Sequence, residues 1–390
     1  MKRRDFLAGT PQPIEGDRGA EILGPQNKPL ERENPESLAP PVTDAGGTPN
    51  LKFSFDQAHN RLTKGGWARE VTVRQLPIAT ALAGVNMRLK PGAIRELHWH
   101  SAAEWAIMLA GRARITVIDP QGRNFVDDVG VGELWNFPAG FPHSIQALDG
   151  GCEFVLVFDD GNFSENDTFL LTDWMVHTPK DVLAKNFSAP ESAFSRIPPD
   201  IEQSRYIFNA PVPGPLNADK VSAPAGATPI SYSFHTDAQV TPVTAPGGQV
   251  RIVDSSVFPA ASTIAAAIID VQPGAVRELH WHPTADEWSY WVQGQGRMTA
   301  FTGKGGAATF DFQAGDVGYV PVAVGHYVEN TGSEPLRFLE LFKSPRYADF
   351  SLAQWLGLLP PELVRDHLPL PKDVIASLPR NKPLVVAGRS

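Results

Sequence analysis

Eight residues of this sequence, six histidines and two glutamates, stand at spacings that suit metal ligation. They form two matching sets: His98, His100, Glu104 and His143 in the first half, and His280, His282, Glu287 and His326 in the second. Side chains alternate along a β-strand, so a His-x-His pair directs both imidazoles to one face, and the glutamate can follow on the same strand or in the next turn. Three imidazoles and one carboxylate leave two positions free on an octahedral metal, as a catalytic metal requires.

The ligand types alone leave the identity of the metal open. The general affinity order favours Cu, Zn or Ni over Mn, whereas the carboxylate and six-coordination suit Mn or Fe. Histidines that merely face solvent on a strand are the alternative to metal binding. That alternative does not require six of the ten histidines to fall into two matching sets, each with its glutamate. We therefore predict two metal sites.

The two sets belong to an internal duplication. Residues 91–100 and 273–282 differ at one position in ten, at a spacing of 182 residues. Other matches pair Gly65-Gly66 with Gly247-Gly248, and Phe169-x4-Trp174 with Phe350-x4-Trp355. A repeat of this length means that each half forms its own domain.

Short β-branched or alternating runs bounded by glycine and proline, such as 113–118 and 317–320, predict an all-β sandwich or barrel in each half. A short helix closes each half, capped by Thr178 in the first and opened by residues 359–362 in the second. The first fifty residues lack periodicity and suggest an extended arm. We place the arm at 1–54, the first domain at 55–228 and the second at 229–390.

Composition limits the kinds of partner and the cellular setting that we expect for this protein. A net charge of −9 without a Lys/Arg cluster argues against nucleic acid, and no apolar run reaches the roughly 20 residues that cross a bilayer. Cys152 is the one cysteine, which excludes an intramolecular disulfide and suggests a buried thiol. The start, residues 2–7, resembles the head of a twin-arginine signal, but proline and acidic residues follow it. We expect a cytoplasmic protein from the sequence as written; the alternative is a periplasmic or secreted protein whose export signal lacks its apolar segment here.

The spacings resemble those of the cupin superfamily. They read Gly92-x5-His98-x-His100-x3-Glu104-x6-Gly111 and Gly274-x5-His280-x-His282-x4-Glu287-x6-Gly294. Ala147 and Ala323 depart from the second motif of the family, where asparagine and glycine are usual, and neither is a ligand. From about Pro11 onward the chain is similar to the bicupin oxalate decarboxylases. The matching segments are Arg-Glu-Leu-His-Trp-His, which occurs twice, Gly318-Tyr319-Val320-Pro321, and Ser164-Glu165-Asn166-Asp167-Thr168.

This resemblance implies two tandem cupin domains, which are jelly-roll β-barrels, with two Mn(II) ions per chain. It implies conversion of oxalate to formate and carbon dioxide, with dioxygen needed as a redox co-catalyst but not consumed. It also implies a hexamer of two trimers and an N-terminal arm that packs across cupin domains.

Arg95 and Arg277 each precede the first histidine of a set by three residues. Strict alternation directs them to the opposite face, where a surface pair with the following glutamate contributes little. A local bulge is the way to bring them inward. The resemblance implies that each arginine binds substrate, and we adopt that view.

Glu165 distinguishes the two halves. It lies in the polar segment 161–168, which we interpret as a mobile lid with Gly161 as its hinge. A glutamate in an acidic loop is usually only solvated, but the corresponding stretch 343–347 contains no carboxylate. The resemblance implies that Glu165 is the proton shuttle of the first site, with a pKa that rises when the lid closes. Asp167 stands where the family has a small hydroxyl residue.

Four tryptophans flank the ligands. Trp99 and Trp281 each lie between two histidine ligands, so alternation points them away from the metal and packing is the expected role. Trp105 and Trp288 each follow a glutamate ligand and are expected in the core.

Two other functions remain as alternatives to the decarboxylase. An oxalate oxidase uses the same metal site without the proton shuttle and releases hydrogen peroxide. A non-enzymatic bicupin of the storage kind commonly loses ligands, whereas all eight remain here.

Overall fold

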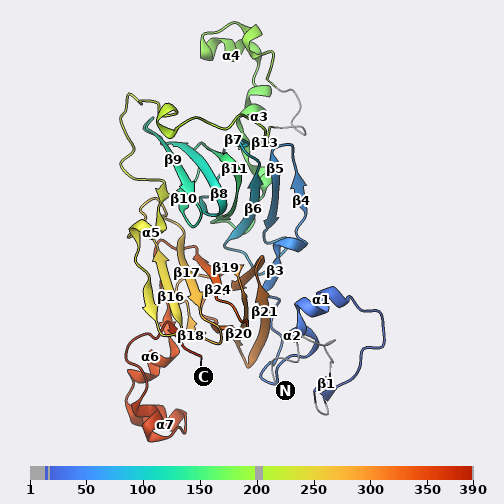
Figure 1. The fold of residues 1–390 in the computed structure, drawn as a ribbon, viewed down its shortest axis with the longest axis vertical. Coiled ribbons are helices and arrows are strands. Elements are labelled where there is room, and N and C mark those ends of the chain that lie inside the picture. Colours follow the sequence, from blue (N-terminus) through green and yellow to red (C-terminus); the bar gives the residue numbers. More distant parts are fainter. Residues whose placement is uncertain (1–13, 16–17, 198–204, 389–390) are drawn as a thin grey trace. The chain divides into compact units, whose positions relative to one another are not determined.

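The computed structural model describes residues 14–15, 18–197 and 205–388, which divide into two units (Figure 1). The first-site unit contains the described parts of residues 57–241 together with 253–265. The second-site unit contains the described residues up to Asp56, residues 242–252, and the described chain from Ala266 onward. The twin-arginine stretch at residues 2–7 lies outside the described residues.

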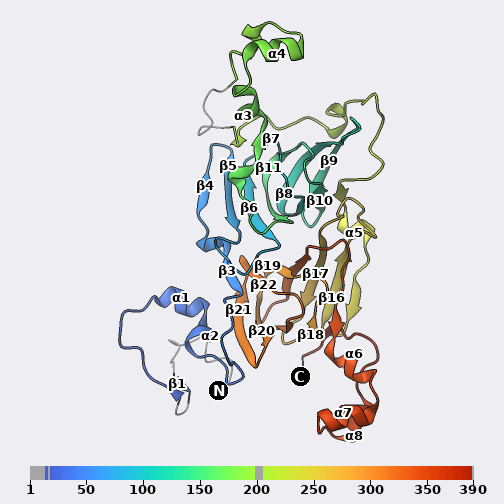
Figure 2. The ribbon, with the colours of Figure 1, turned by 180° about the vertical axis from the view of Figure 1, so that it is seen from behind.

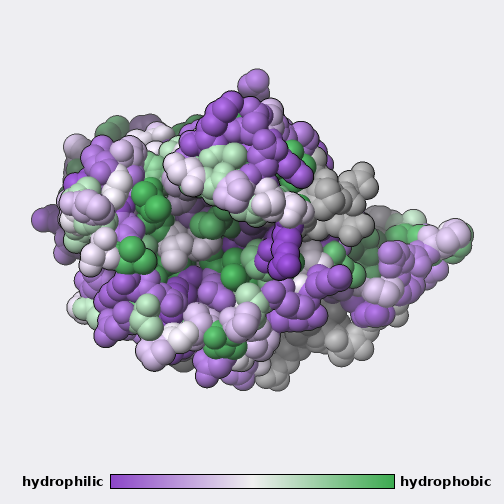
Figure 3. All heavy atoms as spheres, turned by 90° about the horizontal axis from the view of Figure 1, so that it is seen from above, coloured by the Kyte–Doolittle hydropathy of each residue, from purple (hydrophilic) through white to green (hydrophobic). Residues whose placement is uncertain are grey.

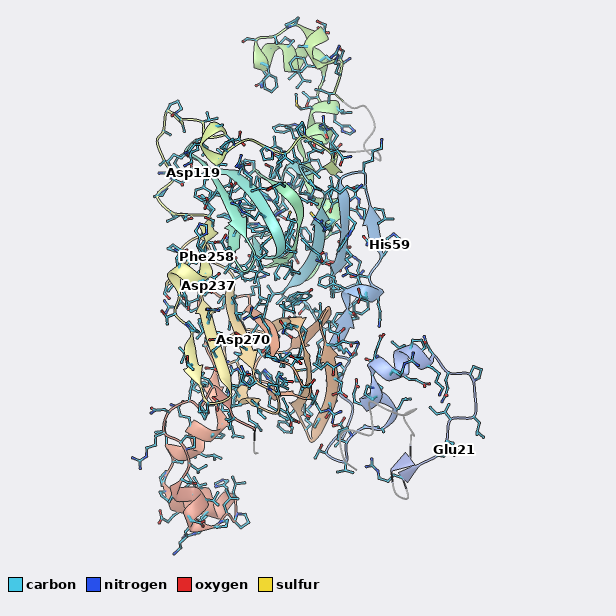
Figure 4. All side chains as sticks on the ribbon, in the orientation of Figure 1. Glu21, His59, Asp119, Asp237, Phe258 and Asp270 are labelled. Carbon is cyan, nitrogen blue, oxygen red and sulfur yellow. The ribbon has the colours of Figure 1, made fainter. Side chains whose placement is uncertain are left out.

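The division departs from a single cut between residues 228 and 229. β14 (Ser233–Phe234) pairs with β10 (Leu134–Phe137), so the chain up to Thr241 joins the first-site unit. Phe258, labelled in Figure 4, belongs to the same unit, and its ring centroid lies 5.2 Å from that of Phe234. β3 (Lys52–Ser54) pairs with β22 (Asp316–Val320), which attaches the arm to the second-site unit. Unpaired strand edges recruit these segments because their backbone groups need partners.

The first-site unit is built on an antiparallel sheet of 11 strands in the order β14-β10-β8-β11-β6-β5-β4, with β7, β9, β12 and β13 pairing off this path. The remaining strands are β4 (Asn60–Leu62), β5 (Gly66–Val71), β6 (Ala83–Leu89), β7 (Ile94–Trp99), β8 (Glu104–Ile118), β9 (Asn124–Gly130), β11 (His143–Phe158), β12 (Phe169–Leu170) and β13 (Ile207–Phe208). The first part of β11 pairs with β7 and its second part with β6. One long strand is thus shared by both faces of the jelly roll.

The second-site unit has a seven-stranded sheet, β15-β16-β17-β24-β19-β22-β3, and a six-stranded sheet, β21-β20-β23-β18-β25 with β26 beside β18 (Figure 2). Its strands are β15 (Val243–Ala245), β16 (Gly248–Val253), β17 (Ala265–Val271), β18 (Val276–Trp281), β19 (Glu287–Gln293), β20 (Gln295–Gly303), β21 (Gly306–Gln313), β23 (Gly325–Asn330), β24 (Leu336–Phe342), β25 (Phe350–Ser351) and β26 (Val385–Val386). β5, β6 and β7 recur as β16, β17 and β18 at the spacing of 182 residues, which confirms the duplication. The all-β prediction is confirmed.

Aromatic side chains fill the core of each unit. Trp105 and Trp288 are fully buried, as the sequence predicted. Trp135 packs edge-on against Phe154 with ring centroids 5.2 Å apart, and Trp291 stacks on Phe338 at 5.0 Å. Cys152 is buried too, and burial raises the pKa of its thiol to about 12, so it is inert as a nucleophile.

Short helices follow the strands. They are α3 (Leu171–Val176), α4 (Lys180–Phe187), α5 (Thr236–Gln239), α6 (Leu352–Gly357), α7 (Pro361–His367) and α8 (Lys372–Ala376). The N-cap position of α4 is Pro179, one residue later than predicted, and it makes no side-chain capping hydrogen bond. The Thr178 hydroxyl instead donates a hydrogen bond to the Trp174 carbonyl in α3 (2.9 Å). No helix among the described residues is long and apolar enough to span a bilayer.

The arm contains more regular structure than the sequence suggested. α1 (Lys28–Glu33) and α2 (Pro35–Leu38) each carry a proline in the first turn, where its missing N–H costs nothing. β1 (Ile14–Glu15) and β2 (Arg18–Gly19) pair with each other. Asp44 accepts hydrogen bonds from the backbone and hydroxyl of Thr309 in β21, which fixes the arm to its unit.

Glu36 of α2 is an acidic group buried where the arm meets β21. It is only 5% exposed, and one of its carboxylate oxygens has no hydrogen-bond partner among the described residues. Burial and the neighbouring charge of Asp311 raise its pKa from 4.5 to about 7, although Lys52 acts in the opposite direction. Asp311 is itself paired with Arg297 at 2.7 Å, which places an ion pair beside Glu36.

Substitution Glu36→Gln should remove a pH-dependent loss of stability. Below pH 4.5 the Glu36 carboxyl is protonated in both the folded and the unfolded chain. Between pH 4.5 and about 7 only the unfolded chain releases this proton, so the free energy of unfolding falls as the pH rises. The variant should therefore gain on the wild type between pH 4.5 and 7, by up to ~3 kcal/mol. Denaturant unfolding at pH 5 and pH 8 measures the difference; a gap that does not widen with pH contradicts the assignment.

Candidate metal centres and active site

A β-bulge at the start of each ligand set determines where the site residues point. In the ladder between β7 and β11, His98 faces His143 and Arg95 faces Ile145, so three steps on β7 oppose two on β11. The extra residue reverses the alternation, and Arg95 faces the same side as His98. β18 repeats this geometry, with His280 opposite His326 and Arg277 opposite Val328. The sequence analysis named a local bulge as the way to bring both arginines inward, and each half contains one.

The predicted ligands come together in both units. Each set offers four ligand atoms that lie within 4.8 Å of one another, and all eight residues are buried: His98, His100, Glu104 and His143, and His280, His282, Glu287 and His326. In the first set, Glu104 Oε2 lies 3.3 Å from His100 Nε2 and 3.6 Å from His143 Nε2. In the second, Glu287 Oε2 lies 3.1 Å from His282 Nε2 and 3.0 Å from His326 Nε2.

Backbone carbonyls fix the tautomer of each imidazole in the first set. His98 Nδ1 donates to the Glu96 carbonyl (2.5 Å), His100 Nδ1 to that of Ala102 (2.6 Å) and His143 Nδ1 to that of Phe141 (2.7 Å). A carbonyl can only accept, so the proton sits on Nδ1 and each Nε2 presents its lone pair to the cluster. Glu96 lies within the bulge, between Arg95 and His98, so the bulge also orients His98.

The second set is oriented in the same way. His280, His282 and His326 donate from Nδ1 to the carbonyls of Glu278, Ala348 and Val324, at 2.7, 2.9 and 3.0 Å. Glu278 again lies within the bulge, between Arg277 and His280. The Nε2 of His280 has no hydrogen-bond partner among the described residues. An orphaned buried acceptor of this kind calls for a cation.

The electrostatics suit a metal ion. Burial, followed by the charges of Arg95 and the other imidazoles, holds the pKa of His98 well below its ordinary value, and burial lowers that of His143. Burial raises the pKa of Glu104, but positive charge on the neighbouring imidazoles would outweigh burial and lower the pKa overall, so the site favours an ionised carboxylate beside a cation. Neutral imidazoles and an ionised carboxylate are the forms that ligate metals. Lone pairs facing a carboxylate oxygen at 3.0–3.6 Å repel one another unless a cation lies between them.

Glu165, the predicted lid residue, lies against Arg95 beside the first ligand set. It begins a 3-10 turn, Glu165–Asp167, whose Asn166 N–H donates to the Ser164 hydroxyl (3.3 Å). Its Oε2 accepts a hydrogen bond from Arg95 Nη2 at 3.2 Å, and both side chains are buried, at 8% and 2% exposure. Burial and the charges of Glu70 and Glu104 raise the pKa of Glu165, although Arg95 acts in the opposite direction. Asp167 ends this turn and Thr168 follows it.

Arg95 is held from a second side by residues that the sequence analysis missed. Its guanidinium lies 3.9 Å from the ring centroid of Tyr206, and the guanidinium of Arg61 lies 3.8 Å from the same ring. Arg95 Nη1 is buried without a hydrogen-bond partner among the described residues. Comparison of the repeats contained a signal for Arg61, because the equivalent position holds Val243.

In the second set, protein carboxylates already bind the corresponding arginine. Arg277 is fully buried and donates from Nε to Glu340 (3.3 Å) and from Nη2 to Tyr347 (2.8 Å) and Asp349 (3.0 Å). Two carboxylates thus occupy the guanidinium. Glu340, Tyr347 and Asp349 were absent from the sequence prediction because they lie about 60 to 70 residues from Arg277 in the chain.

Matching aromatic clusters lie outside both metal sets. Trp99 stacks on Phe169 at 5.6 Å and contacts Trp174 edge-on at 5.5 Å, and Trp281 meets Phe350 and Trp355 at 5.4 and 5.8 Å. The expected packing role of Trp99 and Trp281 agrees with these contacts. Trp174 and Trp355 remain 64% and 51% exposed. Seen from the end that carries α3 and α4, apolar residues lie in a hollow bordered by hydrophilic ones (Figure 3).

Comparison with known proteins places the chain in a family. The cupin family model matches twice, at residues 53–193 and 236–374, so this is a protein with two cupin domains. Oxalate decarboxylase OxdC of Bacillus subtilis is 56% identical over 99% of this chain and 98% of its own length. A probable oxalate decarboxylase of Arthroderma benhamiae is 42% identical over 96% of this chain and 93% of its own length.

The solved structures agree. A structure of the Bacillus subtilis oxalate decarboxylase at pH 4.6 superposes with a TM-score of 0.95 at 55% identity, covering 97% of this chain and 98% of that one. Another structure, which matches equally well, comes from work on the Mn(II) centres of the same enzyme. The chain belongs to the family of the bicupin oxalate decarboxylases.

Removing one ligand should empty one centre and leave the other. His143→Ala deletes an imidazole from the first set alone, and the loss of a direct ligand should weaken binding by more than the roughly 10–100-fold that loss of an outer-shell partner costs. Metal analysis after dialysis should fall from two ions per chain to one, since the structure contains two sets. His326→Ala is the matched control in the second unit. Loss of both ions from either single variant would contradict independent sites.

Proposed function

We propose that the protein is an oxalate decarboxylase that converts oxalate to formate and carbon dioxide, with Mn(II) in both centres and dioxygen as redox co-catalyst. Similarity to named oxalate decarboxylases along nearly the whole chain supports the reaction and the substrate. The observation that carries the proposal is the Glu165–Arg95 contact above an intact ligand set, because it supplies a proton carrier and a cation together.

The first unit already contains residues that suit a metal ion. His98, His100, His143 and Glu104 would hold it in the first unit, with Nε2 and carboxylate oxygens as ligands. A redox-capable metal supplies a binding position for one oxalate carboxylate and a route for one electron to leave the substrate and return. A mixed set of imidazoles and a carboxylate is compatible with manganese.

Arg95 would bind the other end of oxalate. Its Nη1 is buried without a partner among the described residues, so an entering carboxylate gains a charge-assisted hydrogen bond there at no cost to an existing one. The ring of Tyr206 against the guanidinium limits its movement. A protein with a net charge of −9 needs such a local cation to attract an anion.

Glu165 would carry the proton. Hydrogen oxalate and the products, formate and carbon dioxide, contain the same atoms and charge, so the reaction needs a proton moved and not consumed. Glu165 accepts the acidic proton of the substrate, the C–C bond breaks, carbon dioxide leaves, and the carboxyl returns a proton to the carbon that becomes formate. A raised pKa suits a group that must both accept and donate in mildly acidic solution.

We propose that the first centre performs this chemistry and that the second has a structural or weakly catalytic role. Arg277 is engaged by Glu340 and Asp349, so a substrate carboxylate would have to displace a protein carboxylate to reach it. The segment 343–347 offers no residue equivalent to Glu165. Substrate binding by Arg277 would therefore first require its release from these two carboxylates.

Replacing Glu165 by Ala should remove formate production and leave bound metal unchanged. Loss of a general acid–base group costs roughly 10²–10⁴-fold in rate. Purified protein with Mn(II) and oxalate at mildly acidic pH is assayed for formate, carbon dioxide and peroxide, with Asp167→Asn as the lid control. Peroxide instead of formate from the wild type would indicate an oxidase, and neither product would indicate a binding protein. Full activity of the variant would remove Glu165 from the mechanism.

We also propose a homo-oligomer, a hexamer of two trimers as the family resemblance implies, working in the cytoplasm. The exposed aromatic clusters around Trp174 and Trp355 support assembly, because contiguous exposed apolar groups mark contact surfaces.

Charge placed in both aromatic clusters should weaken that assembly. Trp174→Glu with Trp355→Glu buries a carboxylate in any contact that covers the clusters, at a cost of at least ~2 kcal/mol per contact. Sedimentation velocity should show smaller species than the wild type. Val131→Glu, at a position 65% exposed between β9 and β10, is the control. A monomeric wild type would refute the proposal outright.

A further inference from the structure

Two side chains outside the metal set hold the tip of the lid by its backbone. Glu70, in β5, accepts a hydrogen bond at Oε2 from the Glu165 N–H (3.1 Å). Arg74, four residues later, donates from Nη2 to the Phe163 carbonyl (3.0 Å). The same Nη2 lies 3.2 Å from Glu70 Oε1, so the two side chains form one unit that bridges lid residues 163 and 165.

We propose that Glu70 and Arg74 are positioning residues that latch the lid in its closed state and so keep Glu165 beside Arg95 while the substrate reacts. This inference rests on the proposed function and extends it, because it identifies what determines the lifetime of the closed lid.

The duplication provides independent support. The spacing of 182 residues places Ile252 at the position of Glu70 and Ser256 at that of Arg74, and β5 and β16 correspond residue by residue. The second half therefore lacks the latch pair as well as the lid carboxylate. A pair that merely stabilised the β-strand would have no reason to be confined to the half that has Glu165.

The base of the lid is fixed by other contacts. Val73 N–H donates to the Gly161 carbonyl (2.8 Å), and Gly161 packs so closely that a Cβ there would lie 2.2 Å from the Ala79 carbonyl oxygen. Phe163 stacks on Phe158 with ring centroids 3.6 Å apart. Because Gly161 and the Phe163 ring are held by close packing, we assign opening to the stretch that begins at the Phe163 carbonyl and includes Glu165, where Arg74 and Glu70 hold the backbone.

The exposure of the pair suits a contact that must release at every turnover. The side chains of Arg74 and Glu70 are 44% and 22% exposed, so water weakens their attraction and competes for the lid's backbone groups. A fully buried ion pair would resist opening and slow substrate entry and product release. The charge of Glu70 has a second effect, because it helps to raise the pKa of Glu165.

Failure of the latch should change the product and not merely the rate. With the lid open, Glu165 cannot return a proton to carbon. The fragment left after the C–C bond breaks then loses its remaining electron pair to dioxygen, giving a second carbon dioxide, and dioxygen takes up two electrons and two protons to become hydrogen peroxide. The ratio of formate to peroxide thus reports how long the lid stays closed.

The test compares Arg74→Ala, Arg74→Lys, Glu70→Ala and Glu70→Gln with the wild type, all loaded with metal. Asp181→Asn is the control, because Asp181 and Lys185 form an ion pair of the same spacing on α4. Each protein is assayed for formate and peroxide, and hydrogen exchange is followed in a peptide spanning residues 159–170. Bound metal and circular dichroism confirm folding.

We expect Arg74→Ala and Glu70→Ala to lower the formate-to-peroxide ratio by about tenfold and to speed exchange in this peptide, as loss of a charge-assisted hydrogen bond implies. Arg74→Lys and Glu70→Gln, which keep a donor and an acceptor, should stay within about threefold of the wild type. Unchanged exchange and product ratio in both alanine variants would overturn the latch, and so would equal damage from Glu70→Gln and Glu70→Ala. A wild type that makes no formate refutes the proposed function, and the exchange data then still decide whether the latch exists.

Discussion

The extra residue in β7, and its counterpart in β18, is the constraint on which both metal centres depend. It directs Arg95 and His98 to the same side of the strand, where strict alternation would separate them. It also turns the Glu96 carbonyl toward His98 Nδ1, which fixes the tautomer that leaves Nε2 free. A single backbone irregularity thus sets the direction of a ligand, its protonation and the place of the cation beside it.

The bulge residues keep this geometry by using their own side chains elsewhere. Glu96 accepts a hydrogen bond from the Thr172 N–H at the start of α3 (2.8 Å), and Glu278 accepts from Leu384 N–H (3.1 Å) and from the Ser351 hydroxyl. The strand that bears the ligands is therefore tied to the segments that close each half.

The loop before the fourth ligand is held in the same way in both halves. The N–H of Ala323, whose φ is +65°, donates to the His282 carbonyl, just as the N–H of Gly140 donates to the His100 carbonyl. An alanine tolerates that conformation at a cost of about 1 kcal/mol relative to glycine.

The two halves share ligands and differ in what surrounds them. In the first, Arg95 keeps a buried nitrogen without a partner among the described residues, and Glu165 supplies a carboxyl of raised pKa. In the second, the carboxylates of Glu340 and Asp349 already neutralise Arg277. The same fold thus provides one centre arranged to receive an anion and one whose cation is internally satisfied. Duplication preserved the metal ligands, while the neighbouring positions diverged.

The sequence by itself determined the duplication, the all-β architecture, the eight ligands and the burial of Trp105, Trp288 and Cys152, because alternation along a strand, runs of apolar residues and a repeated motif can all be recognised from the order of residues alone. It also singled out Glu165 by its absence from the second half. Only the tertiary structure decided which way Arg95 points, since a bulge depends on pairing with a strand some fifty residues away. It alone brought Tyr206 and Arg61 against Arg95, and Glu340 and Asp349 against Arg277, because side chains far apart in sequence meet only after the sheets have closed.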